Sequence, residues 1–321
     1  SSSAASDVDK RQVLTNAAGF LAMGPSLATI PADNTDLVVH VSGINQGMHD
    51  DLRVANDYAS ALSTAAMLSD VGYEVVLSAS RQEAIDVAHY AYTRKTKRAF
   101  VHIFDGAYAA CERSVLSPPS SKAPEPCTYT GPSAPATALV MPHGAMSHRA
   151  RALLLSLPPH LRGKVGIVSV RRLGSWDAAV LRRAVPTSVQ TLRVVEEAFS
   201  STDGALYADV LESVLSGALR GVRAQSLVLA PGQALCPEAW LALLSLAAEQ
   251  ATPFSLKDVL ARAAAVQVPD LMPFSNSHLV TFVGTDAGVS VPTAELLARS
   301  LFNASKHVRM LSRYDNYAAG G

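Results

Sequence analysis

Four residues around the end of one apolar segment could form a ligand site. The segment RAFVHIFDGAYAACE, residues 98–112, begins with residues typical of a buried strand and breaks at Asp105-Gly106. Open α/β sheets bind their ligands at the carboxyl ends of strands, so His102, Asp105, Gly106 and Glu112 are candidates for a ligand edge. An aspartate followed by glycine is also an ordinary turn signal, in which the carboxylate hydrogen-bonds nearby backbone. We favour that structural role for Asp105.

Two other places could bind an anion. Gly284 and Gly288 lie between a strand-like run and a helix-like run, and free N–H groups at a helix N-terminus can hold a phosphate. Arg171 and Arg172 belong to a basic segment, residues 170–184, that could bind a carboxylate or phosphate. We prefer a plain strand-to-helix turn for the glycines. For the arginines we prefer a solvated helix face with one or two ion pairs at a strand end.

The histidines are candidates for metal ligands or for core hydrogen bonds. His143 and His148 lie five residues apart around a glycine turn and could share a metal. No third ligand is near them in the sequence, so we expect a solvated turn and no metal site. His40 and His102 lie inside apolar strands, where we expect hydrogen-bonded core histidines.

Common catalytic signatures are absent from the sequence. It contains no phosphate loop, no Gly-x-Gly-x-x-Gly turn, no Gly-x-Ser-x-Gly elbow and no His-Glu-x-x-His helix. The Gly-Asp-Gly…Asn-Asn signature that binds magnesium and diphosphate in thiamine enzymes is also missing. No residue is therefore assigned a catalytic role.

Composition excludes several classes of partner. The chain has 27 Lys and Arg against 27 Asp and Glu, and a protein with no net charge has no electrostatic reason to follow nucleic acid. No run approaches 18 apolar residues, and the first ten residues do not resemble a secretory signal. Three widely spaced cysteines, Cys111, Cys127 and Cys236, indicate reduced thiols. We expect a cytoplasmic protein without a membrane span.

Apolar strand-like runs alternate with amphipathic helix-like runs, which predicts parallel α/β sheets covered by helices on both faces. Ser80 and Glu83 fit a capping box at the start of one of these helices. Residues 117–136 are rich in proline and serine and are typical of a linker. The expected division is a disordered tail 1–9, a first α/β unit 10–116, the linker 117–136, a second unit 137–222 and a further α/β segment 223–321.

The order of these modules resembles pyruvate:ferredoxin oxidoreductases. The first unit resembles the later part of their first domain through HVS at 40–42, the SRQE stretch at 80–83, and Asp105-Gly106 with Glu112 behind it. The second resembles their transketolase C-terminal-like domain through residues 161–186 and LYADV at 206–210. The resemblance implies a Rossmann-like thiamine diphosphate-binding fold joined to a transketolase C-terminal-like domain.

Residues 57–83 resemble a variant of this module more closely. That variant forms the N-terminal region of the flavoprotein subunit of NADPH-dependent sulfite reductases and related P450-reductase-like diflavin proteins. The resemblance implies partners: flavin and nicotinamide domains of the same polypeptide that carry FAD, FMN and NADPH, or an electron-acceptor protein. It is also compatible with a homodimer.

The sequence departs from the oxidoreductases where their function lies. The arginine that follows HVS and faces the substrate is replaced by Ile44, which cannot clamp a carboxylate. The usual Asp-Arg of the second domain is Glu196-Glu197, and its Arg-Pro-Phe is residues 174–176, Gly-Ser-Trp. The part that carries the thiamine-activating glutamate has no counterpart. We therefore expect the thiamine site to be lost.

These observations predict a cofactor-less, structural or partner-docking module of an NADPH-dependent diflavin oxidoreductase. Two alternatives remain open. The chain could be a subunit of a thiamine diphosphate-dependent 2-oxoacid oxidoreductase that a partner chain completes. It could also be a degenerate scaffold protein in a large assembly.

Overall fold

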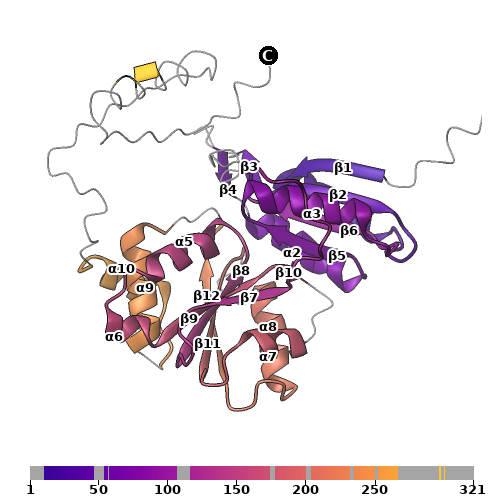
Figure 1. Cartoon of the computed structure of the whole chain (residues 1–321). Helices are drawn as coiled ribbons and strands as arrows, with labels where there is room; N and C mark the ends of the chain where they lie inside the picture. Colours follow the sequence, from indigo (N-terminus) through magenta and orange to yellow (C-terminus); the bar gives the residue numbers. More distant parts are fainter. Residues whose placement is uncertain are drawn as a thin grey trace, which may run out of the picture.

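The computed structural model describes residues 11–46, 54–56, 58–106, 116–173, 178–199, 204–231, 235–249 and 252–266, with 296, 297 and 300. In this part of the chain, two five-stranded sheets form the centres of two α/β units, and a two-stranded sheet of β3 (Ile44–Gln46) and β4 (Val54–Asn56) is separate (Figure 1). The candidates Glu112, Gly284 and Gly288 lie outside the described residues.

The first sheet is parallel except for one edge. Its order is β1 (Arg11–Asn16), β2 (Leu37–Ser42), β6 (Phe100–Phe104), β5 (Glu74–Ser78) and β10 (Arg172–Leu173). The first four strands run parallel, whereas β10 pairs antiparallel with β5. Because β10 lies in the segment that forms the second unit, that unit supplies an edge strand of the first sheet.

Helices cover both faces of the first sheet. Side chains alternate along a strand, so Val39, Val75 and Val101 face the helices α1 (Ala17–Ala28) and α2 (Tyr58–Asp70). On the other face, Phe100 packs with Val87 of α3 (Arg81–Thr93). The predicted capping box at the start of α3 is confirmed, because Ser80 accepts from the Glu83 N–H and the Glu83 carboxylate accepts from the Ser80 N–H.

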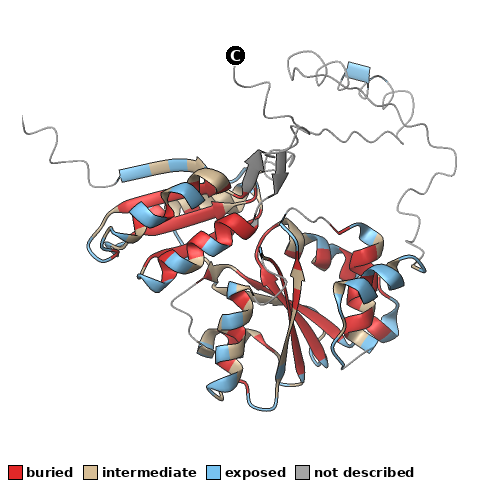
Figure 2. Cartoon of the chain, turned by 180° about the vertical axis from the view of Figure 1, so that it is seen from behind, coloured by how far each residue is buried: buried red, intermediate tan, exposed pale blue. Residues whose placement is uncertain are grey.

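The second sheet repeats this architecture. Its order is β12 (Arg223–Leu229), β11 (Thr191–Glu197), β8 (Thr137–Pro142), β9 (Val165–Val170) and β7 (Cys127–Thr130), with only β7 antiparallel. One face packs against α5 (Ala145–Leu154), α6 (Pro159–Arg162), α9 (Pro237–Glu249) and α10 (Leu256–Ala263). The other face packs against α7 (Ala178–Ala184) and α8 (Ala205–Leu215). The predicted three-layer α/β/α organisation is confirmed in both units (Figure 2).

The two units share one hydrophobic core. Helix α2 of the first unit contacts α8 and β11 of the second, as well as β10. Buried residues of both units, such as Leu62 and Val194, belong to the same cluster. The units are therefore packed against each other and are not joined by a linker alone. No helix in the described ranges is long and apolar enough to cross a bilayer.

The strands extend beyond the expected domain ranges. Strand β7 lies within 117–136, because Cys-Thr-Tyr-Thr has the β-branched and aromatic residues that favour a strand and pairs with β9. Strand β12 and helices α9 and α10 continue the second unit past residue 222. The proline-rich segment therefore supplies an edge strand as well as a connection.

Tyr129 fastens β7 to the sheet. Its hydroxyl donates to the Pro132 carbonyl at 2.6 Å, and its ring lies over Gly166 of β9, where a Cβ would overlap the ring and the hydroxyl. We expect Gly166→Ala to lower the free energy of unfolding by about 1–3 kcal/mol, as overpacking does. Urea unfolding measures the change.

Gly163→Ala is the matched control for this prediction. Gly163 has a φ of −70°, and the nearest atom to its Cβ position is the Pro159 carbonyl oxygen at 3.7 Å. We expect no loss, or a gain of about 0.4–1 kcal/mol from a less flexible unfolded chain. Equal losses for the two variants would contradict the proposed packing of Tyr129.

Candidate functional site

The carboxyl ends of strands from the two sheets meet at the junction of the units. Asp105 follows β6, and its Oδ2 accepts from the backbone N–H of Ala145, in the first turn of α5, at 3.0 Å. Strand β8 lies between β9 and β11 in the second sheet. The connection from β8 to β9 and the connection from β9 to β11 therefore run in opposite directions across the sheet. Such a switch point is where open α/β sheets place ligand sites. The residues that follow β5, β6, β8 and β9 therefore define the candidate site.

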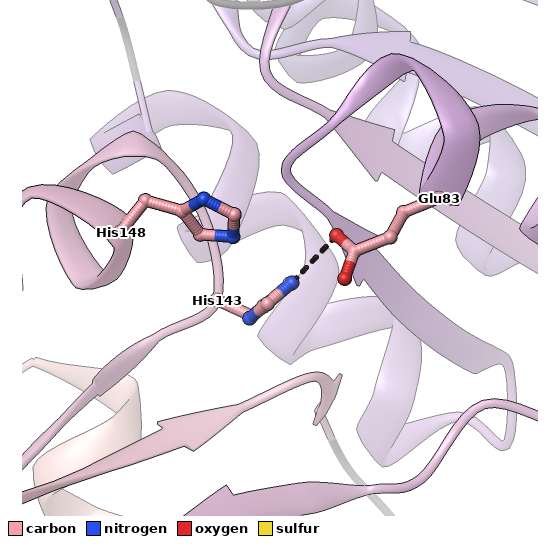
Figure 3. A group of neighbouring side chains, drawn as sticks. All are labelled: Glu83, His143 and His148. Carbon is pink, nitrogen blue, oxygen red and sulfur yellow. Dashed lines mark hydrogen bonds and ion pairs between the residues drawn. The ribbon is translucent and has the colours of Figure 1, made fainter. Parts of the chain in front are cut away.

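Glu83 is the central residue of this junction. It lies in the first turn of α3, and its Oε2 accepts from the Ala79 N–H at 2.9 Å. The same Oε2 lies 2.7 Å from Nε2 of His143, which follows β8, while Oε1 accepts from Nη2 of Arg171, which follows β9, at 2.6 Å. Figure 3 shows Glu83 of the first unit pointing toward His143 of the second.

The charge of Glu83 is fixed by its partners. Burial alone raises the pKa of the Glu83 carboxyl, but the contacts with His143, Arg171 and the Ala79 N–H outweigh burial and hold the pKa well below its usual range. The carboxylate is therefore ionised at neutral pH, and the Arg171 guanidinium balances it. The Arg171 side chain is only 15% exposed, so this ion pair is largely shielded from water.

His143 is not on a solvated turn, and that expectation is wrong. The residue is 1% exposed. Burial lowers the pKa of His143, although the Glu83 hydrogen bond opposes the shift. A neutral His143 donates from Nε2 to Glu83, even though Nη2 of Arg171 also lies 3.1 Å from the same nitrogen. Nδ1 of His143 is buried and has no hydrogen-bond partner among the described residues.

His148 completes a group of three possible metal ligands. Its ring lies with its centroid 5.5 Å from that of His143, at an angle of 70°. One ligand atom each from Glu83, His143 and His148 lies within 4.8 Å of the others. Sequence spacing could not find Glu83, which lies 60 residues before His143. A usable signal was present, however, because Glu83 and His143 each come shortly after an apolar strand-like run of the sequence, residues 73–80 and 136–142.

Asp105 and Gly106 lie at the junction, but His102 does not share a site with them. Asp105 is fully buried, and a carboxylate at the first turn of α5 interacts favourably with the helix dipole. The His102 side chain lies on the α3 side of the first sheet, where Nε2 is 2.7 Å from the Ser78 hydroxyl. The described members of the predicted edge, His102, Asp105 and Gly106, thus lie in different environments, and Glu112 lies outside the described residues.

His40 and His102 are the expected hydrogen-bonded core histidines. Their Nδ1 atoms lie 3.0 Å apart, and Nε2 of His40 lies 3.3 Å from the Tyr92 hydroxyl. Burial, followed by the neighbouring His40, lowers the pKa of His102 to about 3. Both rings are therefore neutral at physiological pH. A neutral imidazole has one donor and one acceptor nitrogen, so one Nδ1 can donate to the other without a buried charge.

The arginine candidates are engaged with acids of the first unit. Arg171 pairs with Glu83, and Arg172 Nη2 lies 3.5 Å from Oε1 of Glu74 at the start of β5. Glu74 also binds Arg94 at 2.7 Å. These contacts are strand-end ion pairs of the kind that we preferred for the two arginines from the sequence. They hold β10 against β5.

Glu196 also has a structural contact, at the position where the resembling oxidoreductases have Asp-Arg. Its carboxylate accepts from the N–H groups of Leu206 and Tyr207 at 3.0 and 2.8 Å and so caps the start of α8. Gly204 leaves room for this carboxylate, because a Cβ there would overlap it.

An open pocket of about 200 Å³ lies beside the Glu83 cluster. Glu83 and Arg171 form part of its wall, together with Asp86 and Val87 of α3. The remaining lining comes from Ser120 and residues 122–125 of the proline-rich segment.

Comparisons with known proteins identify the fold. No protein-family model and no curated protein matches the sequence. Among solved structures, the chain is similar to the inactive β4 tetramer of a split-gene transketolase, with 17% identity and a TM-score of 0.50 over 79% of this chain and 75% of that chain. The chain therefore has an α/β/α fold similar to that of this transketolase.

Removal of the Glu83 charge should weaken the junction. Glu83→Gln leaves Arg171 without its counter-charge, and we expect the free energy of unfolding to fall by about 1–3 kcal/mol, less than for a fully buried pair because the Glu83 side chain is 28% exposed. Glu212→Gln, an exposed change on α8, is the control and should stay within about 0.5 kcal/mol. Additive effects of Glu83→Gln and Arg171→Leu in a double-mutant cycle would contradict the pairing.

The buried histidines should make the protein sensitive to acid. The folded-state pKa of His102, about 3, lies below the usual 6.5, so the unfolded chain takes up the proton first as the pH falls. The stability that neutral His102 contributes to the fold is therefore complete above pH 6.5, and it is lost as the pH falls from 6.5 to 3. NMR of labelled imidazoles at pH 5 should show neutral His102. A titration midpoint above pH 5 would contradict the burial argument.

Proposed function

We propose that the chain is a thiamine-fold module with a structural and partner-docking role and no thiamine diphosphate of its own. The observation that carries this proposal is the commitment of the junction residues to each other. Glu83 binds His143 and Arg171, and Asp105 binds the start of α5. Polar groups that could hold thiamine diphosphate at this edge instead join the two units.

The size and donors of the site also support the absence of thiamine diphosphate. The pocket beside Glu83, at about 200 Å³, is smaller than the roughly 300–1,000 Å³ typical of cofactor sites. Its wall carries the carboxylates of Glu83, Asp86 and Glu125 against the cations Arg171 and Lys122, so it offers no excess of positive charge for a diphosphate. The sequence also lacks the magnesium–diphosphate signature. The described residues therefore do not fit this cofactor.

We further propose that the module belongs to a cytoplasmic NADPH-dependent diflavin oxidoreductase of the sulfite reductase or P450 reductase type. FAD, FMN and NADPH would be bound by other domains of that polypeptide, and this module would orient them or dock an electron-acceptor protein. The proposal rests on the resemblance of residues 57–83 and on the replacement of the substrate-facing arginine by Ile44.

A second candidate is a thiamine diphosphate-dependent subunit that another chain completes. The transketolase to which this chain is similar is the product of a split gene and is inactive as a β4 tetramer. By analogy, a partner chain with Gly-Asp-Gly…Asn-Asn would supply the diphosphate site. Purification of the native protein distinguishes the candidates, because recovery of such a chain favours the subunit and an intrinsic flavin spectrum favours the diflavin reductase.

Titration calorimetry with thiamine diphosphate and Mg²⁺ tests the central proposal. We expect no heat and no change in Tm up to millimolar cofactor, because the edge residues are engaged with each other. Micromolar binding would contradict the proposal. Loss of that binding in Asp105→Asn would then place the cofactor at the junction. Absence of flavin from the native full-length protein would overturn the diflavin assignment separately.

A further inference from the structure

We propose that Glu83, His143 and His148 form a binding site for a divalent transition metal of the Zn²⁺ class at the junction of the two units. This inference goes beyond the proposed function. It assigns a ligand to side chains contributed by both α/β units. It rests on the convergence of three suitable side chains from two distant parts of the chain (Figure 3).

The donor set suits such a metal. Two imidazoles and one carboxylate are ligands that Zn²⁺ accepts, and three protein ligands leave a fourth position for water or another ligand. The three donor atoms lie within 4.8 Å of one another. Tetrahedral Zn²⁺ with bonds of about 2.0–2.2 Å needs them roughly 3.4 Å apart. Side-chain rotations cover this difference, since Glu83 and His148 are both only partly buried.

Metal binding would change the contacts of Nε2 of His143. Its Nε2 lies 2.7 Å from a Glu83 oxygen, which requires an N–H, and 3.1 Å from an Arg171 N–H, which requires a lone pair. One nitrogen cannot satisfy both contacts. A metal bound at Nε2 would replace the Nε2 proton in the contact with Glu83 and would exclude the Arg171 N–H from this nitrogen. Arg171 then keeps its 2.6 Å hydrogen bond to the other Glu83 oxygen, Oε1.

The surrounding charges determine the expected affinity and the fourth ligand. Arg171 contacts Glu83 directly, and Arg151 is close enough to interact with its charge. Two guanidinium groups lower the affinity for a dication and favour an anion, such as hydroxide, at the fourth position. Nδ1 of His143 lacks a hydrogen-bond partner among the described residues, and an incomplete outer shell weakens metal sites about 10–100-fold. We therefore expect binding weaker than at structural zinc sites.

Metal binding would act on the contact between the units. Glu83 comes from α3 of the first unit, whereas His143 and His148 come from the β8–α5 connection and α5 of the second. A ligand that binds only when both units are docked stabilises the docked state. At a hundredfold excess over Kd, we expect Tm to rise by roughly 3–5 °C for a chain of this length.

The test uses the full chain after chelator dialysis, with Zn²⁺ alone as the probe. We expect one equivalent of Zn²⁺ to bind in calorimetry and Tm to rise with Zn²⁺ concentration. His148→Gln should abolish both effects and leave the metal-free Tm within a few degrees of wild type. His160→Gln, at an exposed histidine of α6, is the matched control and should retain both effects.

Co²⁺ distinguishes this site from binding to a thiol. We expect tetrahedral d–d absorption without thiolate charge transfer, and the same spectrum in Cys236→Ser, because the proposed ligands are nitrogen and oxygen. No Zn²⁺-dependent change in Tm, unaltered binding in His148→Gln, or a thiolate spectrum would each overturn the proposal. None of these results depends on thiamine diphosphate or flavin, so the two proposals fail separately.

Discussion

The Glu83 carboxylate is the contact on which the junction of the two units depends. It caps its own helix through the Ala79 N–H and also binds His143 and Arg171 of the other unit. A partly buried charge is tolerated only when such partners are in place, because removal of one partner leaves the other uncompensated. The capping requirement fixes the position of Glu83 on α3, and the charge requirement then fixes where the second unit docks.

Packing and strand pairing maintain the same arrangement over a wider surface. Helix α2 contributes to a core that includes residues of both sheets, and β10 extends the first sheet with residues of the second unit. Arg171, which immediately precedes β10, is therefore held in place by backbone pairing as well as by Glu83. In particular, its carbonyl accepts from the Leu77 N–H at 2.7 Å. The electrostatic contact and the sheet thus reinforce each other.

The fold and the site give different kinds of information about this protein. The α/β/α architecture is that of the transketolase neighbour, and a shared fold alone does not determine function. Function must be inferred from the groups at the facing strand ends. There, Asp105 and Glu83 hold helices and partner side chains, while His148 adds a third donor beside His143. These contacts support a structural module whose edge residues join its two α/β units and offer the proposed metal site.

The sequence by itself determined the alternation of buried strands and helices, the Ser80–Glu83 capping box and the burial of His40 and His102 within strands. All of these follow from local patterns, because side-chain periodicity and capping depend on neighbouring residues. Only the tertiary structure decided that Glu83 meets His143 and Arg171, which lie 60 and 88 residues away along the chain. Those contacts arise from the docking of two sheets at their carboxyl ends. The pattern within each segment contains no information about the partner that it will face across the junction.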